Sequence, residues 1–226
     1  MSAATQIVAI DGPAGTGKSS VARALAKRLG FRFLDTGAMY RAATWRALHH
    51  GIDLEDRDAL VDSTRAMQLE LRDEGAGFRV FVDGTEVTDD IRTREVTRTI
   101  ARLDQIPEVR EHLVELQRAY GEAGPTVAEG RDMGTIVFPN ASCKIFLDAS
   151  PEVRAQRRVD QIHRAGGEAD YDAILHEIME RDMATRKRKL APLKRAKGAE
   201  FVDTTEMTFE AVLDRLAELA REKLCL

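Results

Sequence analysis

The sequence is short of cysteine: Cys143 and Cys225 are the only two among 226 residues. Cys143 lies inside an apolar run and Cys225 is next to last, which fits neither a disulfide framework nor a zinc cluster. No apolar stretch approaches the ~18 residues that a membrane span needs. The N-terminus also lacks the charged and apolar regions of a signal peptide. We therefore expect a cytoplasmic protein with no membrane partner.

An excess of positive charge is also missing. The chain has 34 Lys and Arg against 38 Asp and Glu, a net charge of −4. It therefore has no overall basic footprint for nucleic acid, and no nucleic-acid partner is expected. With 43% apolar residues, the chain is long enough for one globular domain with a buried core.

Strand-like apolar runs alternate with helical patterns along most of the chain. Residues 6–11 form the first run, and glycines and a helical apolar pattern from Val21 to Leu29 follow it. Further strands are expected at 31–34, 126–128, 144–147 and 200–202, with helices over about 38–50, from Ser150 onward, and over about 208–224. Five strands with interleaved helices predict a parallel, doubly wound α/β sheet.

Two stretches break this alternation. Between Ser63 and Ile91, alternating short runs and an Asp83-Gly84 turn predict an antiparallel insertion, and arginine-studded helices follow over about 93–103 and 107–120. From Pro151 to Lys197, basic residues concentrate in an otherwise acidic protein. Gly166-Gly167 lies between the two helical parts of this basic segment and predicts a hinge or a tight turn.

Residues 12–19, here called the phosphate loop, satisfy the pattern G-x-x-x-x-G-K-[ST] directly after a strand and at the start of a helix. Glycines allow backbone N–H groups to turn toward phosphate oxygens, and the helix N-terminus adds partial positive charge. Lys18 is expected to reach the β- and γ-phosphates and Ser19 to hold Mg²⁺. The alternative is a glycine-rich turn without a ligand. The expected ATP-binding residues are Gly12, Pro13, Ala14, Gly15, Thr16, Gly17, Lys18, Ser19 and Ser20.

Two further clusters are expected at the ligand-binding edge of the sheet. Asp35 to Arg41 follows the second strand, so Arg41 is placed to clamp an acceptor phosphate, unless it is a solvated charge on a helix. Glu129-Gly130-Arg131-Asp132 ends the third strand of the sheet. For this cluster the competing interpretation is a structural ion pair between Arg131 and Asp132.

Together these motifs make the chain resemble the bacterial cytidylate kinases, which belong to the nucleoside monophosphate kinase superfamily of P-loop proteins. The most diagnostic stretch is Gly130-Arg131-Asp132-Met133-Gly134-Thr135. The resemblance runs from Ile7 to the last helix and is carried by residues 10–18, 35–41, 91–93, 107–110, 130–139, 144–149, 181–182 and 191–193.

The resemblance implies one P-loop kinase domain over residues 1–226. Its five-stranded parallel sheet would be flanked by helices, with the antiparallel insertion inside a monophosphate-binding region at about 37–121 and a helical lid at about 154–190. It implies transfer of the γ-phosphoryl group of ATP, with Mg²⁺, to CMP and dCMP, giving CDP or dCDP and ADP. We expect the enzyme to be a monomer.

Individual roles also follow from the resemblance. Arg41 and Arg131 would hold the CMP phosphate, while Arg110 and Asp132 would read the cytosine. A carboxylate and a guanidinium together match the donor and acceptors of cytosine, an edge that uracil does not offer. The implied catalytic residues are Lys18, Arg131, Arg158, Arg181 and Arg188. The implied CMP-binding residues are Thr36, Tyr40, Arg41, Arg110, Arg131, Asp132, Arg181, Thr185 and Arg188.

The lid contains three arginines, Arg154, Arg157 and Arg158, at i, i+3 and i+4. This spacing predicts one helix face that delivers charge to the transferring phosphoryl group when the lid closes, or else a solvated basic face.

Two positions depart from the family pattern. Ala101 stands where the family usually has a serine that contacts the base, and Thr185 stands where it usually has an aspartate that contacts the ribose. Two alternatives remain: a kinase for AMP, UMP or shikimate, and a P-loop ATPase that passes a conformational change to a partner.

Overall fold

The computed structural model describes residues 6–74 and 77–226. The chain divides into two compact units, the first made of Met1–Leu34 with Ala123–Leu226 and the second of Asp35–Glu122. The first five residues, on which part of the signal-peptide argument rests, lie outside the described residues. No helix in the described part of the chain has the length and apolar character to span a membrane.

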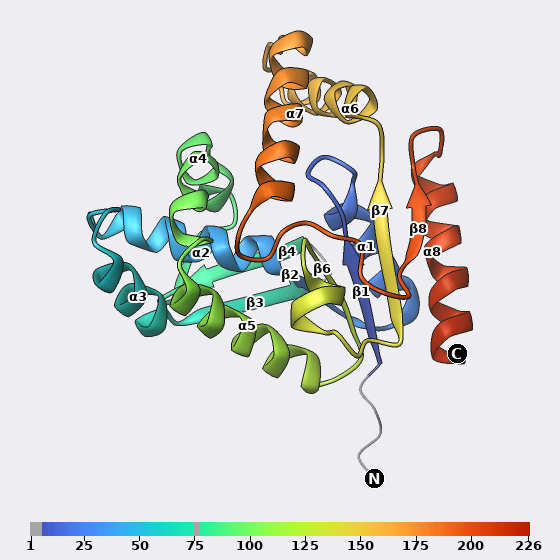
Figure 1. The fold of residues 1–226 in the computed structure, drawn as a ribbon, viewed down its shortest axis with the longest axis horizontal. Helices are drawn as coiled ribbons and strands as arrows, with labels where there is room; N and C mark the ends of the chain where they lie inside the picture. Colours follow the sequence, from blue (N-terminus) through green and yellow to red (C-terminus); the bar gives the residue numbers. More distant parts are fainter. Residues whose placement is uncertain (1–5, 75–76) are drawn as a thin grey trace. The chain divides into compact units, whose positions relative to one another are not determined.

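The first unit is built on a sheet, which in the described residues has five strands in the order β2-β6-β1-β7-β8 (Figure 1). Adjacent strands β6, β1, β7 and β8 run parallel, as the sequence predicts. The strand bounds are β1 Ile7–Asp11, β2 Arg32–Asp35, β6 Thr126–Gly130, β7 Cys143–Asp148 and β8 Glu200–Asp203.

The central strands β1 and β6 are buried at every position. Asp11 pairs in register with Gly130, so both strands end at the same level. The phosphate loop and Arg131 therefore leave the sheet at the same edge, because each directly follows one of these strands. This is the edge at which a parallel α/β sheet binds its ligands.

The helices of the first unit begin and end at residues suited to those positions. Helix α1 starts after Gly17 and ends at Gly30, both in the left-handed region with φ of 87° and 70°. Ser150 caps the N-terminus of α6, its hydroxyl accepting a hydrogen bond from the N–H of Val153. The bounds are α1 Lys18–Leu29, α6 Pro151–Arg164, α7 Tyr171–Lys187 and α8 Phe209–Leu224.

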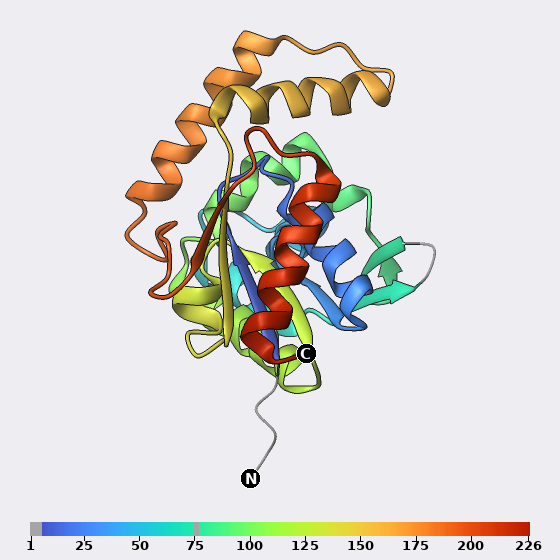
Figure 2. The same cartoon turned by 90° about the vertical axis from the view of Figure 1, so that its right-hand side faces the viewer.

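The basic segment is confirmed as two helices joined by a turn that contains Gly166, whose φ is 78°. Figure 2 shows α6 and α7 beyond the carboxyl ends of the strands, while α8 lies along the sheet. One element is unexpected. Residues Met133–Val137 form a single π-helical turn directly after Asp132, and such turns are frequent at functional sites.

In the second unit, helices and a small antiparallel sheet share one core, to which Ala42, Leu60, Val80, Ile91 and Leu113 belong. The sheet has the order β3-β4-β5 within the described residues. The bounds are α2 Thr36–His49, α3 Arg57–Ala66, β3 Leu69–Glu74, β4 Gly77–Val82, β5 Thr85–Glu86, the 3₁₀ turn Asp90–Arg92, α4 Arg94–Leu103 and α5 Pro107–Glu122.

The predicted hairpin turn is confirmed, because Asp83 and Gly84 both have positive φ, 49° and 81°. The first strand-like run of the insertion, predicted at Met67 to Leu71, is strand β3, which is shifted by two residues at its start. Ser63 lies in α3, and the sheet begins only at Leu69. The charged residues of α3 hid its buried face from the sequence analysis, although Asp56 caps the helix by accepting a hydrogen bond from the N–H of Ala59.

Candidate active site

The phosphate loop has the backbone conformation that its glycines permit. Gly12, Gly15 and Gly17 have φ of 155°, 81° and 87°, which L side chains rarely adopt. A Cβ atom on Gly12 would lie 2.0 Å from the carbonyl oxygen of Leu147. Glycine is therefore required where β7 passes the loop.

Lys18 is folded back onto this loop. Its Nζ donates to the carbonyl oxygen of Pro13 at 2.6 Å, and the side chain is buried. Burial lowers the pKa of Lys18 to about 8, and the positive charges of Arg131 and Arg181 act in the same direction. Glu129 partly offsets this effect, because its negative charge raises the pKa of Lys18. These groups therefore surround one ammonium group in the first unit.

Glu129 also holds the Ser19 side chain. The Ser19 hydroxyl donates to Oε1 of Glu129 at 2.6 Å, and Glu129 is 5% exposed. Glu129 was not predicted as a site residue, although it lies in the cluster at the end of the third strand. The sequence did contain an indication of such a role, because Glu129 is a carboxylate in a strand whose other residues are apolar or small.

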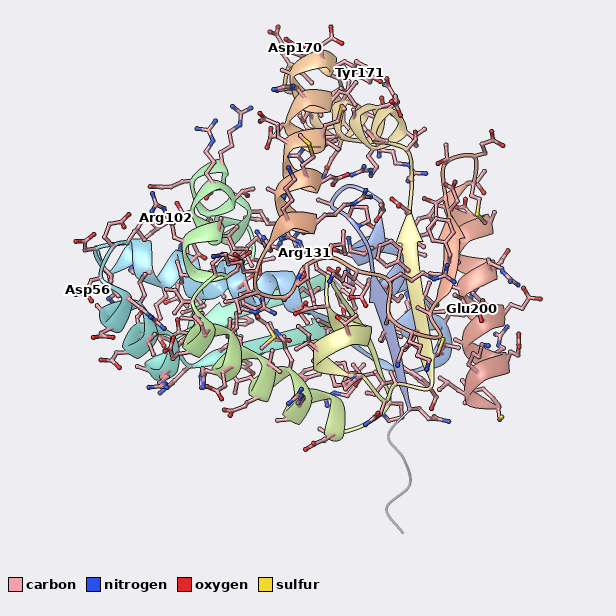
Figure 3. The ribbon with its side chains drawn as sticks, in the orientation of Figure 1. Asp56, Arg102, Arg131, Asp170, Tyr171 and Glu200 are labelled. Atoms are coloured by element: carbon pink, nitrogen blue, oxygen red, sulfur yellow. The ribbon has the colours of Figure 1, made fainter. Side chains whose placement is uncertain are left out.

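Asp11 is a second residue to which the sequence analysis gave no role. Its carboxylate accepts hydrogen bonds from the backbone N–H groups of Met133 at 2.7 Å and Gly134 at 2.8 Å. Burial raises the pKa of Asp11 to about 6 despite these two bonds. The two bonds fix the backbone that follows Arg131 and Asp132, and Figure 3 labels Arg131 at the end of β6.

The three lid arginines differ in their contacts. The Arg154 guanidinium is buried and donates to carbonyl oxygens of Ala149 and Ala14. Arg157 donates to the carbonyl oxygen and the hydroxyl of Thr204. Arg158 is exposed, and its guanidinium donates to the side-chain oxygen of Gln161 at 2.7 Å. Two of the three side chains thus bond to segments distant in sequence and the third is exposed, while the delivery of charge on closure of the lid stays a prediction.

Arg181 and Thr185 lie in the last turns of α7, and Arg188 directly follows the helix. The Thr185 side chain is buried, and its hydroxyl donates to the carbonyl oxygen of Arg181 at 2.7 Å. The helix ends at Lys187, and Arg188 has φ −56° and ψ 139°. Arg188 therefore lies just outside the helix and does not continue the face that Arg181 and Thr185 share.

In the second unit, two arginines lie around one buried carboxylate at the start of α2. Asp35 caps the helix by accepting the N–H of Ala38 at 2.7 Å. Its carboxylate lies 3.2 Å from Nη2 of Arg41 and 3.6 Å from Nη2 of Arg92. Among the residues that the structure describes, Nε of Arg41 is buried without a hydrogen-bond partner. Arg92 was not predicted as a site residue, although it lies in one of the stretches that carry the resemblance.

The same unit brings together Tyr40 and Arg110. The guanidinium carbon of Arg110 lies 5.5 Å from the centre of the Tyr40 ring, within the range of a cation–π contact. Thr36 is the first residue of α2 and is buried, whereas Ala101 is exposed on α4. The predicted site residues of this unit are Thr36, Tyr40, Arg41 and Arg110. Those of the first unit are the phosphate loop with Ser20, and Arg131, Asp132, Arg158, Arg181, Thr185 and Arg188.

Comparison with known proteins places these features in one family. The family model described as cytidylate kinase matches residues 8–222. The cytidylate kinase of Corynebacterium glutamicum is 50% identical over 220 residues, which cover 97% of this chain and 96% of the relative. The cytidylate kinase of Vibrio cholerae is 43% identical over 224 residues, covering 99% of this chain and 100% of the relative. A solved structure of an uncharacterized protein from Eubacterium ventriosum shares the fold with a TM-score of 0.53 at 14% identity, covering 96% of this chain and 99% of that one. The chain therefore belongs to the cytidylate kinase family.

Proposed function

We propose that this protein transfers the γ-phosphoryl group of ATP to CMP and dCMP, giving CDP or dCDP and ADP. One observation carries the proposal: a complete phosphate loop with a buried lysine, in a chain that the cytidylate kinase model matches from residue 8 to 222. A phosphate loop alone names no acceptor, since many unrelated activities share it. The family likeness supplies the acceptor class.

The phosphate loop, Gly12 to Ser19, and Ser20 are assigned to ATP. Main-chain N–H groups would surround the phosphates and Lys18 would contact the β- and γ-phosphates. Ser19 and Glu129 supply oxygen atoms, the ligands that Mg²⁺ prefers, so the residues present fit this ion. Bound with ATP, Mg²⁺ would neutralise charge that develops on the phosphates.

The acceptor is assigned to the residues that the family likeness implies. From the second unit, Arg41 offers guanidinium donors to the CMP phosphate, and we add Arg92 because it lies near the same carboxylate. Tyr40 and Arg110 offer an aromatic ring and donors to the base. The remaining assignments are Thr36 from this unit, and Arg131, Asp132, Arg181, Thr185 and Arg188 from the first.

Catalysis would rest on position and charge. The acceptor is a phosphate oxygen that is already ionised, so no general base is needed. We assign Lys18, Arg131, Arg158, Arg181 and Arg188 to the stabilisation of the transferring group. We also propose that residues 37–121 form a monophosphate-binding region and that residues 154–190 form a lid. The compact unit Asp35–Glu122 supports the first of these regions.

A coupled assay for ADP tests this function. ATP and Mg²⁺ are supplied with CMP, dCMP, UMP, AMP or shikimate in turn, and one reaction has no acceptor. We expect turnover with CMP and dCMP and its loss when a chelator removes Mg²⁺. Faster turnover with another acceptor would assign the protein to that acceptor. Equal ATP hydrolysis without any acceptor would indicate an ATPase switch.

A further inference from the structure

Arg154 is only 2% exposed, and in the described residues it is the largest of the fully buried side chains. It is also charged. Its guanidinium has a partner in three different segments. Nε donates to the carbonyl oxygen of Ala149 at 2.9 Å, and Nη1 donates to that of Ala14 at 3.1 Å. Nη1 and Nη2 donate to the two carboxylate oxygens of Asp182 at 3.1 and 2.5 Å. Arg154 thus joins the end of β7, the phosphate loop and helix α7.

The aliphatic part of the same side chain supports the phosphate loop. A Cβ atom built on Gly15 would lie 3.4 Å from Cβ, 3.8 Å from Cγ and 3.9 Å from Cδ of Arg154. The backbone of Gly15 therefore packs against the Arg154 stem, next to the carbonyl of Ala14 that accepts a hydrogen bond. The loop is held on Arg154 by both packing and a polar bond.

Asp182, the acidic partner of Arg154, is next in sequence to a proposed catalytic residue. Asp182 directly follows Arg181, whose positive charge lowers the pKa of Lys18. We propose that Arg154 and Asp182 are positioning residues for phosphoryl transfer. Their ion pair fixes α7, and with it Arg181, relative to the phosphate loop that carries Lys18. This inference rests on the proposed function.

Two apolar side chains at this part of α7 are largely exposed. Met179 and Met183 are 48% and 54% exposed, and together with Phe201 they line an open hollow of about 450 Å³. A buried ion pair is weak evidence for stability, since apolar replacements of such pairs are often neutral or stabilising. A two-bond arginine–carboxylate contact does, however, define direction and distance. We therefore assign geometry, rather than stability, to the Arg154–Asp182 pair.

The first test compares Asp182→Asn with Glu177→Gln, an exposed carboxylate on the same helix. We expect Asp182→Asn to lower kcat by about tenfold to a hundredfold, because small misplacements of reacting groups have effects of this size. The KM for ATP should change by less than about threefold. Amide hydrogen exchange of the phosphate loop and α7 should become faster in this variant. Glu177→Gln should change none of these quantities.

The second test separates positioning from stability. The double substitution Arg154→Met with Asp182→Leu replaces the pair by apolar side chains and leaves no buried charge unpaired. We expect its Tm to stay within a few degrees of that of the wild-type protein while its kcat remains low. Recovery of wild-type kcat in this double variant would overturn the proposal, because the pair would then serve stability alone.

Each remaining outcome is also decisive. Equal kcat and equal hydrogen exchange in Asp182→Asn and Glu177→Gln would overturn the proposal. If the wild-type protein shows no transfer to CMP, the proposed function fails. Hydrogen exchange still tests the ion pair in that case, because it needs no acceptor. Unchanged exchange in Asp182→Asn would then reject the positioning role independently.

Discussion

Two buried charged groups of the first unit, Lys18 and Asp11, bond to backbone atoms, whereas in the second unit the buried Asp35 carboxylate has charged side chains around it. Lys18 donates to a carbonyl oxygen and Asp11 accepts from two backbone N–H groups. Arg41 and Arg92 instead lie around the Asp35 carboxylate. Backbone partners provide no opposite full charge. Lys18 and Asp11 are therefore buried charges with displaced pKa values, while the Asp35 group of the second unit, like the Arg154–Asp182 pair of the first, sets charge against charge.

The largest effect that would test this comparison is expected from Lys18→Met. Loss of one preorganised cation should lower kcat by about 10²–10³-fold. The folded protein binds the Lys18 proton less tightly than the unfolded chain, since the pKa falls from 10.5 to about 8. The charged lysine therefore costs stability at every pH below 8. The variant should gain roughly 1–3 kcal/mol in its free energy of unfolding at pH 7.

Urea unfolding and steady-state kinetics measure these two changes on the same sample. Arg158→Met is a useful control for charge removal on stability, because that side chain is exposed. Near wild-type activity of Lys18→Met would contradict the catalytic role of Lys18. Easier unfolding of this variant would contradict the expected cost of burying the charged lysine.

The next largest effect concerns the pH dependence of stability that Asp11 produces. Its pKa is about 6 in the folded protein against 3.8 ordinarily, so the folded state binds this proton more tightly. Stability from Asp11 is present at low pH and is lost as the pH rises from about 4 to about 6. The loss should total roughly 3 kcal/mol, at about 1.4 kcal/mol per tenfold difference in proton affinity.

The measurement is urea unfolding between pH 4 and pH 7.5 for the wild-type protein and for Asp11→Asn. The free energy of unfolding of the wild-type protein, minus that of Asp11→Asn, should fall as the pH rises to about 6. This difference should be constant above pH 7. A difference that does not vary with pH would show that the Asp11 carboxylate is not held at a raised pKa.

Asp35→Asn tests the second unit with an intermediate expected effect. Asparagine keeps the N-cap of α2 but lacks the charge that holds Arg41 and Arg92. We expect the KM for CMP to rise about tenfold, the effect of roughly one lost charge-assisted hydrogen bond, while the KM for ATP stays unchanged. Asp56→Asn is the matched control, because Asp56 also caps a helix of this unit and is exposed (Figure 3). Equal KM values for the two variants would contradict the role of Asp35.

The smallest expected effect concerns a buried polar side chain of the second unit that, unlike Asp35, has no polar partner among the described residues. Gln117 on α5 is fully buried, and its amide oxygen and nitrogen have no hydrogen-bond partner within residues 6–74 and 77–226. Gln117→Met keeps the shape and removes the unpaired polar atoms. It should raise the free energy of unfolding by about 1 kcal/mol. Gln105→Met is the control, since the Gln105 amide donates to Asp104. A loss of stability in Gln117→Met would reveal an additional partner, such as a bound water.

Local patterns allowed much of the fold to be predicted. Strands β1, β6 and β7 each contain a short run of apolar or β-branched residues, and the Asp83-Gly84 turn has the residues that its positive φ angles require. Helix α3 was missed because only two of its four buried residues, Leu60 and Val61, are apolar, and charged residues flank them in sequence. Its apolar face becomes evident only when Leu60 and Val61 are seen in the core of the second unit.

The sequence by itself determined the phosphate loop, the alternation of strands and helices, and the family, because each depends on residue types at short, fixed spacings. Only the tertiary structure decided the partners of the charged groups. Asp11 bonds to backbone 122 and 123 residues away, and Arg154 bonds to the phosphate loop 140 residues away. A single sequence states the charge of such a group but not its distance from others. The burial and the distances that set its pKa and its role arise only when the strands and helices pack.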